Sequence, residues 1–240
     1  MCHQVGQKHS CTSPGLDSYS DTIRMEDLVM SLSRNLPYQR HGLVGTITMA
    51  TRSGAKLNPT IPGQISAKGL DRICEIASSL SDGAVIVETG SLYGLSSWHW
   101  SHNAPPSSQV FCIDPWERRP WIIEKVEKRF KCAEFSLDAF LSYTNDCDNI
   151  IPIVGKSPDV ARGWRLPIDV YFDDSVHSNP MFRRNLTHWR RFVKPGGWLC
   201  GDDYSPSSFP DIVSEVSALS SELGVPAEVH GSVWSIRVPG

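Results

Sequence analysis

The chain has 240 residues, of which 40% are hydrophobic and 20% are charged, and its formal net charge is −3. These values fit one globular domain and exclude a disordered chain, and the negative charge provides no general attraction to nucleic acid. No apolar run reaches the length of a membrane span or of a secretory signal, so we expect a cytoplasmic protein with a small-molecule partner. Composition leaves open whether the chain forms a homo-oligomer.

The cysteine pattern predicts reduced thiols. The seven cysteines are scattered without paired spacing, which differs from a disulfide framework. Cys2 with His3, and His9 with Cys11, resemble halves of a zinc site, but no second pair at zinc-finger spacing follows them. We therefore expect no metal site in this part of the chain.

The first quarter of the chain carries weaker structural signals than the rest. Residues 1–20 are polar and rich in Ser, Gly and Pro, which is typical of a loosely attached tail. Apolar residues recur at helical spacing over 21–36, which predicts an amphipathic helix that could act as a lid. The remainder is loop-rich, with one short strand expected near 44–49. We therefore divide the chain into an extension, 1–64, and a folded domain, 65–240.

Helical and strand patterns alternate from residue 65 onward. The predicted helices cover 65–80, 96–102, 121–131, 137–143, 181–193 and 212–223. The predicted strands cover 84–87, 110–113, 150–154, 170–172, 198–201, 227–230 and 232–238. This alternation predicts an α/β fold with a doubly wound, mostly parallel sheet. The link at Gly231 is too short for a helical crossover, so the last two strands should be antiparallel neighbours.

A glycine-containing turn, ETGSLYG at 88–94, follows the first strand of the domain. In open α/β sheets, ligands bind where such strands end. Gly90 and Gly94 would allow a sharp turn and a close backbone approach to a ligand, and Glu88 would project an acceptor carboxylate into the crevice. Leu92 stands at the middle glycine of a dinucleotide motif, so phosphate-free, cationic S-adenosylmethionine is favoured. The alternative is a tight turn without a ligand.

A second acid, Asp114, ends the next strand, where a carboxylate can accept both ribose hydroxyls of an adenosine-containing cofactor. Trp116 could lie against the adenine or belong to the core. Ser157 could bond the adenine, although small residues at strand ends also serve turn geometry. The predicted cofactor residues of these segments are Glu88, Gly90, Ser91, Gly94, Ser96, Asp114, Trp116 and Ser157.

Two pairs of adjacent aspartates follow two later strands: Asp173 with Asp174, and Asp202 with Asp203. The ends of neighbouring parallel strands would bring these carboxylates into one crevice, where they repel each other unless a hard divalent cation such as Mg²⁺ is bound. Asp202 and Asp203 can bind one metal only if the strand has ended before them. The alternative is that these acids cap turns and helices.

His177 is the nearest candidate for a general base. A metal in the crevice would bind a substrate hydroxyl, lower its pKa and hold it in line with the methyl group of the sulfonium. An imidazole suits removal of that proton at neutral pH, although a histidine beside a helix start is as readily a surface residue. The cluster therefore predicts methylation of an oxygen, with His177 and Asp174 as catalytic residues.

Three segments of the chain resemble one enzyme family: VIVETGSLYGLSSW (85–98), VFCIDPWE (110–117) and VYFDDSVHSNPMFRRNLTHWRRFVKPGGWLCGDDY (170–204). They are similar to the class I methyltransferases grouped around macrocin O-methyltransferase and its cephalosporin-pathway relatives. The resemblance covers roughly residues 65–238. It implies a Rossmann-like, seven-stranded sheet with a reversed last strand, S-adenosylmethionine at the acidic glycine turn, and Mg²⁺ bound by acids after two strands.

The resemblance also implies particular ligands. It assigns Asp174, Asp202 and Asp203 to the metal, and Asp174 also faces the cofactor. Aligning His177 with the family's Asp-Gly-Asp-His-Ser stretch places Asp174 on the first aspartate, and Val176 replaces the second. We therefore expect a Mg²⁺-dependent O-methyltransferase that acts on a small hydroxylated molecule, such as a natural-product intermediate.

Other functions compete with this hypothesis. Methylation of nucleic acid bases or glutamine amides typically needs an Asn/Asp-Pro-Pro-aromatic segment, which 173–177 lacks. A metal-dependent hydrolase or lyase could use the acids and His177 without the cofactor. A non-catalytic accessory protein could keep the fold to bind a partner enzyme. Sugars, catechols and polyketide or peptide hydroxyls all suit a metal-assisted transfer to oxygen.

Overall fold

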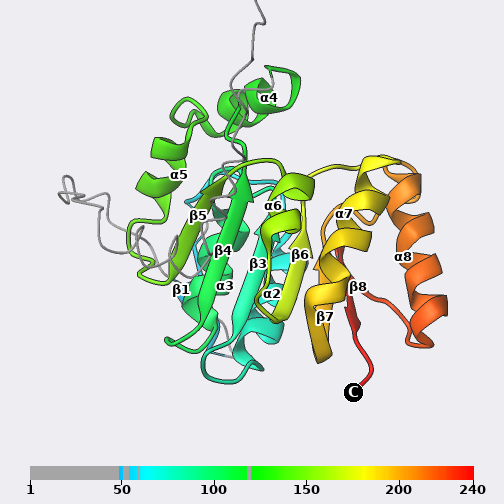
Figure 1. Cartoon of the computed structure of the whole chain (residues 1–240). Coiled ribbons are helices and arrows are strands. Elements are labelled where there is room, and N and C mark those ends of the chain that lie inside the picture. Colours follow the sequence, from blue (N-terminus) through cyan, green and yellow to red (C-terminus); the bar gives the residue numbers. More distant parts are fainter. Residues whose placement is uncertain (1–48, 51–53, 59, 118–119) are drawn as a thin grey trace, which may run out of the picture. The chain divides into compact units, whose positions relative to one another are not determined.

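The computed structural model describes residues 49–50, 54–58, 60–117 and 120–240. Its main feature is a seven-stranded sheet in the order β5-β4-β3-β6-β7-β9-β8 (Figure 1). The strands are β3 (Val85–Thr89), β4 (Gln109–Asp114), β5 (Ile150–Val154), β6 (Ile168–Asp173), β7 (Val193–Gly201), β8 (Glu228–His230) and β9 (Val233–Arg237). Strands β3 to β7 are parallel, whereas β9 is antiparallel to both β7 and β8. The predicted α/β, Rossmann-like sheet with a reversed last strand is confirmed.

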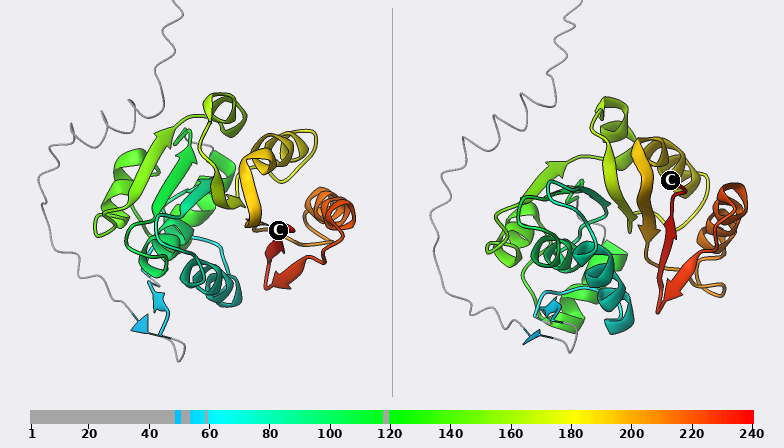
Figure 2. Two further views of the ribbon diagram at one scale, coloured as in Figure 1. Left: turned by 60° about the horizontal axis from the view of Figure 1, so that its bottom comes forward. Right: turned by 90° about the horizontal axis from the view of Figure 1, so that it is seen from below.

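Helices cover both faces of this sheet. They are α2 (Ala67–Ser78), α3 (Leu95–Asn103), α4 (Pro120–Phe130), α5 (Leu137–Tyr143), α6 (Ser157–Gly163), α7 (Met181–Trp189), the 3₁₀ turn η1 (Arg190–Phe192) and α8 (Pro210–Leu223). Figure 2 shows α2 and α3, in teal, on one face and α7, in yellow, on the other. Within the described chain, no helix combines the length and the apolar character needed to span a bilayer.

The central strands are apolar because both of their faces are covered. Phe111 of β4 and Phe172 of β6 are fully buried, and they point to opposite layers of the core. On one side Trp100 of α3 meets Phe172, with ring centroids 5.7 Å apart. On the other side Trp164 meets Phe111, with centroids 4.9 Å apart. Such near-continuous apolar runs are typical of the strands of a parallel sheet that is buried on both faces.

Two parts of the predicted element order were wrong. The sequence pattern gave no helix at α6, because seven residues that include Pro158 and Gly163 carry too few turns for a periodic signal. It also extended the helix of α7 to Val193, whereas the chain passes through η1 after Trp189 and enters β7 at Val193. The apolar spacing of Trp189, Phe192 and Val193 fits either structure, so the periodicity did not mark the change.

The described part of the first quarter contributes to the core. Strand β1 (Met49–Ala50) pairs antiparallel with β2 (Lys56–Leu57). Ile61 is buried at 3% exposure and belongs to the main hydrophobic cluster. The expected tail and lid helix lie outside the described residues, and the strand expected near 44–49 reaches them only at its end. All five cysteines in the described ranges are free thiols, as expected.

His99 of α3 contacts the segment that contains Asn58. Its ring is fully buried, accepts the Asn58 N–H at Nε2 (3.3 Å), and lies 2.6 Å from Leu95 O at Nδ1, so Nδ1 carries the hydrogen of a neutral imidazole. Burial lowers the pKa of His99 to about 4, against an ordinary value of 6.5. A folded-state pKa below the unfolded one means that stability is complete above pH 6.5 and is lost as the pH falls toward 4.

We expect this loss to reach about 3 kcal/mol of unfolding free energy between pH 6.5 and 4. Buried carboxyl groups titrate in the same range, so the measurement is the difference between wild type and His99→Gln in urea denaturation across that range. The wild-type curve should fall more steeply with decreasing pH than that of the variant. Parallel curves would show that His99 is not held neutral by the fold.

Candidate active site

A cavity of about 400 Å³ opens at the carboxyl ends of the parallel strands. Its wall includes residues that follow four different strands: Gly90 after β3, Asp114 at the end of β4, Asp174 after β6, and Asp202 after β7. The volume lies within the range of pockets for small molecules and cofactors. The strand order changes direction between β3 and β6, because the chain runs outward from β3 through β4 to β5 and then returns to β6. Ligands of doubly wound sheets bind at this point.

The turn after β3 depends on two glycines with positive φ. Gly90 (φ 87°) lines the cavity, and a Cβ there would lie 2.1 Å from the carbonyl oxygen of Asp174. Gly94 (φ 93°) begins α3, and a Cβ there would lie 2.5 Å from the methyl group of Thr144. Gly90 therefore brings the turn against the end of β6, beside the cavity. Gly94 serves packing inside the protein and is not part of the cavity wall, contrary to its predicted role.

Gly90→Ala is expected to destabilise the protein more than Gly83→Ala. Gly83 also has a positive φ (74°), but no atom lies within 4 Å of its would-be Cβ, so it isolates the backbone strain of about 1–2 kcal/mol. The clash with Asp174 should add about 1–3 kcal/mol at Gly90. Urea denaturation of both variants measures the difference. Equal losses would mean that the contact between Gly90 and β6 is not required.

Glu88 lies beneath the turn instead of in the cavity, which corrects the predicted orientation. Its side chain is fully buried, and Ser97 of α3 donates a hydrogen bond to Oε2. Burial raises the pKa of Glu88, and the hydroxyls of Ser96 and Ser97 partly oppose that rise. Ser91 and Ser96 are buried in the same layer, at 2% and 3% exposure. The sequence pattern places these residues at the right turn, but Glu88 is bonded to α3 and none of the three lines the cavity.

Asp114 combines two roles at the end of β4. Its Oδ2 accepts the Leu92 N–H (3.2 Å) and its Oδ1 accepts the Trp116 N–H (2.7 Å), while the residue also lines the cavity. Trp116 itself belongs to the core: its Nε1 donates to Leu92 O (3.1 Å), and its ring centroid lies 4.9 Å from that of Phe140. Two roles were considered for Trp116, contact with the adenine and packing in the core, and the geometry supports packing in the core. Asp114 therefore faces the cavity from a turn that its own carboxylate organises.

Ser157 lines the cavity at the first residue of α6. Its hydroxyl oxygen accepts the Trp189 Nε1–H at 2.9 Å. The predicted position of Ser157 beside a bound ligand therefore agrees with the geometry. The Trp189 indole already occupies one acceptor site of the Ser157 hydroxyl. This hydroxyl can therefore accept fewer hydrogen bonds from a ligand than the hydroxyl of an isolated serine.

Three aspartates from two strand ends line the same cavity: Asp174, Asp202 and Asp203. Strands β6 and β7 are parallel neighbours with Asp173 opposite Gly201, so the residues that follow them emerge side by side. Strand β7 ends at Gly201, and Asp203 adopts a positive φ of 62°. The strand therefore ends before the acid pair, which is the condition under which both acids can face one site.

The structure distinguishes Asp173 from Asp174. The carboxylate of Asp173 is 3% exposed and is satisfied locally, because it accepts the Tyr171 hydroxyl (2.8 Å), the Ser175 hydroxyl (2.7 Å) and the Ser175 N–H (3.2 Å). These contacts close the turn after β6, which is the structural role considered for such acids. Asp174 has its place in the cavity wall instead. Asp174 is therefore the acid of this pair that is available to a ligand.

The carboxylates of Asp174, Asp202 and Asp203 repel one another. Burial raises the pKa of Asp174 well above its usual range, and the charges of Asp202 and Asp203 raise it further. Burial also raises the pKa of Asp202, and a hydrogen bond of 2.5 Å from the Ser232 hydroxyl to Oδ1 partly opposes this. Carboxylates that are held together in this way favour a bound cation, and hard oxygen ligands suit Mg²⁺.

His177 adjoins the same cluster. Its Nε2 lies 2.6 Å from Oδ2 of Asp203, and the ligand atoms of Asp174, His177 and Asp203 all lie within 4.8 Å of one another. Burial lowers the pKa of His177, but the hydrogen bond and charge of Asp203, with other nearby acids, outweigh this effect and raise it overall. The structure thus brings the predicted base together with two of the predicted ligands, Asp174 and Asp203, while the third, Asp202, lines the same cavity outside this group.

Sequence reasoning missed further residues of the cavity wall, among them Gln64, Lys125, Met181, Asn185 and Phe209. Asn185 donates through Nδ2 to the Ser175 hydroxyl (2.8 Å), while its buried Oδ1 has no partner among the described residues. Phe209 packs on His177, with ring centroids 4.7 Å apart. A polar residue on the buried face of a helix was the only signal for Asn185, and Phe209 lies in a turn that gives no periodic signal.

Comparison with known families agrees with this arrangement. Residues 87–204 match a family model described as a methyltransferase domain. This segment begins in β3 and ends just after the Asp202–Asp203 pair, so it contains the strand ends that contribute to the cavity wall. The matched region is therefore the region that carries the candidate site.

Solved structures share the fold at low sequence identity. The O-methyltransferase TomG from Streptomyces achromogenes, involved in tomaymycin synthesis and solved with SAM, is 18% identical with a TM-score of 0.53, covering 74% of this chain and 82% of its own. A methyltransferase from Geobacter sulfurreducens is 17% identical with a TM-score of 0.52, covering 73% and 80%. MycE methyltransferase from the mycinamycin pathway, solved with Mg, SAH and mycinamycin VI, is 15% identical with a TM-score of 0.51, covering 74% and 50%. The chain thus shares the Rossmann-like fold of these methyltransferases, and its residues 87–204 match the model of a methyltransferase domain.

Proposed function

We propose that this chain is an S-adenosylmethionine-dependent, Mg²⁺-dependent O-methyltransferase of the macrocin O-methyltransferase group. Its acceptor would be a hydroxyl of a small molecule, such as a natural-product intermediate. The observation that carries the proposal is the convergence of Asp174, Asp202, Asp203 and His177 in the same cavity as Asp114. The likeness to the O-methyltransferase TomG supports the choice of oxygen, and the synthetic pathways of TomG and MycE support a natural product as the acceptor.

The cavity fits S-adenosylmethionine on three grounds. Gly90 leaves the backbone of the turn bare at the cavity wall, where a Cβ would collide with β6. The Asp114 carboxylate faces the cavity at the end of β4, where it can accept hydroxyl donors of a ribose. The cofactor carries an ammonium and a sulfonium, so the acidic lining favours it over a phosphate-bearing dinucleotide.

The donor set likewise fits Mg²⁺. Asp174, Asp202 and Asp203 would hold the ion, since they offer carboxylate oxygens from two adjacent strand ends. A dication there offsets the repulsion that raises the pKa of Asp174. When both groups are bound, Mg²⁺ supplies the Lewis acidity that makes a hydroxyl more acidic, and S-adenosylmethionine supplies the methyl group.

The residues of the chain perform the remaining steps. Oδ2 of Asp203 accepts the Nε2–H of His177, with 2.6 Å between nitrogen and oxygen, which orients the ring and leaves Nδ1 to take the proton from the acceptor hydroxyl. The charge of Asp203 then stabilises the imidazolium, consistent with the raised pKa of His177. Phe209, packed on the imidazole, helps to exclude water from this position.

The experiment that tests the proposal is calorimetric titration of the purified chain with S-adenosylmethionine and S-adenosylhomocysteine, with and without Mg²⁺. Micromolar binding of both is expected, followed by Mg²⁺-dependent methyl transfer when hydroxylated acceptors are screened. Metal binding without cofactor binding would favour a hydrolase or lyase. Cofactor binding without turnover on any hydroxylated acceptor would favour an accessory protein.

A further inference from the structure

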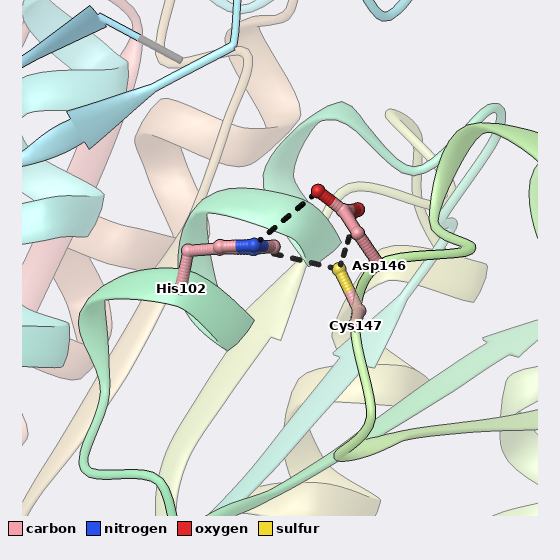
Figure 3. A group of neighbouring side chains, drawn as sticks. All are labelled: His102, Asp146 and Cys147. Atoms are coloured by element: carbon pink, nitrogen blue, oxygen red, sulfur yellow. Dashed lines mark hydrogen bonds and ion pairs between the residues drawn. The ribbon is translucent and has the colours of Figure 1, made fainter. Parts of the chain in front are cut away.

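A second group of potential metal ligands consists of His102, Asp146 and Cys147 (Figure 3). His102 stands in the last turn of α3, and Asp146 with Cys147 stands in the turn between α5 and β5. Strands β4 and β5 begin just after these two segments, with Val110 paired to Ile150. The group therefore lies at the amino ends of the strands, whereas the cavity lies at their carboxyl ends. None of the three residues belongs to the cavity wall.

The separation of His102 and Asp146 suits two ligands of a small tetrahedral ion, and Cys147 contacts both residues. Nε2 of His102 lies 3.5 Å from Oδ2 of Asp146, and Sγ of Cys147 lies 3.5 Å from Nδ1 of His102 and 3.7 Å from Oδ1 of Asp146. Ligand atoms around a tetrahedral Zn²⁺ are about 3.3–3.6 Å apart, given bonds of about 2.0–2.3 Å. One ligand atom from each residue already lies within 4.8 Å of the others.

Trp98 orients two of the three ligands. Its carbonyl oxygen lies 3.2 Å from Nδ1 of His102, and its indole stacks on the imidazole with ring centroids 3.8 Å apart. Because a carbonyl can only accept, Nδ1 carries the hydrogen of a neutral imidazole, and Nε2, which faces Asp146, is the nitrogen available to a metal. The indole N–H of Trp98 also donates to Oδ1 of Asp146 (3.0 Å). Such outer contacts fix both the ring and the carboxylate before any ion arrives.

We propose that His102, Asp146 and Cys147 bind a divalent transition-metal ion, Zn²⁺ by preference. A combination of imidazole, carboxylate and thiolate suits Zn²⁺, whereas Mg²⁺ and Ca²⁺ require oxygen ligands. The side chains of His102 and Asp146 are 17% and 33% exposed, so solvent can reach the ion and water can complete its coordination. The ion would tie the end of α3 to the turn before β5 and so stabilise this edge of the sheet.

The same three residues could be taken for a nucleophilic cysteine with its histidine and acid. One feature opposes that function. Oδ1 of Asp146 lies 3.7 Å from the sulfur of Cys147, and a carboxylate at this distance disfavours a free thiolate. A bound dication reverses this effect, because it stabilises the thiolate and the carboxylate together. The arrangement therefore favours coordination over nucleophilic attack.

Co²⁺ titration of the metal-free, full-length protein tests the proposal. Co²⁺ replaces Zn²⁺ and produces a sulfur-to-cobalt charge-transfer band only when a thiolate is a ligand, so the carboxylate cluster of the cavity does not contribute to this signal. The band of the wild type should reach its full intensity when one Co²⁺ per chain is bound by a thiolate. Cys147→Ser should not show the band. The matched control is the double variant Cys2→Ser/Cys11→Ser, which removes the other cysteines that adjoin histidines and should keep the band.

Three results would overturn the proposal: no band in wild type, a band that persists in Cys147→Ser, or a band that disappears in the double variant. Circular dichroism checks that Cys147→Ser is folded. If it is not, His102→Gln takes its place, and its affinity for Co²⁺ should fall at least about tenfold. Zn²⁺ should also raise the thermal midpoint of wild type by more than that of His102→Gln, in which the carboxylate cluster of the cavity is intact. This readout is independent of methyl transfer and of cofactor binding.

Discussion

Asp203→Asn is expected to weaken binding of a divalent cation in the cavity by at least about 100-fold, because even changes outside the ligand shell lower metal affinity by 10–100-fold. The variant removes one of three carboxylates and also the 2.6 Å contact with Nε2 of His177. Asn is the informative replacement, because Asp203 has φ 62° and Asn tolerates this conformation better than Ala. Mn²⁺ binding, followed by electron paramagnetic resonance, measures the loss without knowledge of the acceptor.

S-adenosylmethionine affinity without metal should remain within about twofold of wild type in Asp203→Asn, since the two subsites make separate contacts. The control is Asp159→Asn, which makes the same charge change in an exposed ion pair with Arg162. Loss of cofactor binding in Asp203→Asn would place this residue in the cofactor site. Unchanged Mn²⁺ binding would place the metal elsewhere.

The fold could be predicted from the sequence where local pattern and tertiary environment agree. The runs that became β4 and β6 are apolar because they are buried on both faces, so their pattern reports their environment directly. Helix α5 was predicted at its observed bounds, with Ser136 as the N-cap that accepts the Ala139 N–H at 3.1 Å. The seven-residue helix α6 and the start of β7 were not predicted, because the backbone conformation of both segments depends on packing against neighbouring elements.

The site was predictable to the level of position and less so to the level of orientation. The rule that ligands bind at strand ends located Glu88, Asp114 and Asp174 at one edge of the sheet. Whether each side chain faces the cavity depends on neighbours distant in sequence. Glu88 turns inward because serines of α3 provide polar partners, and Asp174 remains at the cavity because the preceding acid closes the turn. A one-dimensional pattern contains no information about these contacts.

Asp114→Asn should have the opposite effect to Asp203→Asn: it should weaken binding of the cofactor and spare binding of the metal. The Asp114 carboxylate is an acceptor for two backbone N–H groups and faces the cavity, so an amide nitrogen in its place leaves one donor unpaired and weakens acceptance from a ligand hydroxyl. Losing about two charge-assisted hydrogen bonds, at about 1.5–3 kcal/mol each, corresponds to a decrease in S-adenosylmethionine affinity of about 100-fold or more. Calorimetry measures this decrease.

Mn²⁺ binding by Asp114→Asn should stay within about twofold of wild type, because the metal ligands follow β6 and β7 while Asp114 ends β4. Each variant then removes one ligand and spares the other. A collapsed turn would instead lower the thermal midpoint and affect both ligands, which distinguishes a structural defect from a lost contact. If either variant lost both ligands while remaining folded, the cavity would contain one shared site, and the separate positions assigned to cofactor and metal would be wrong.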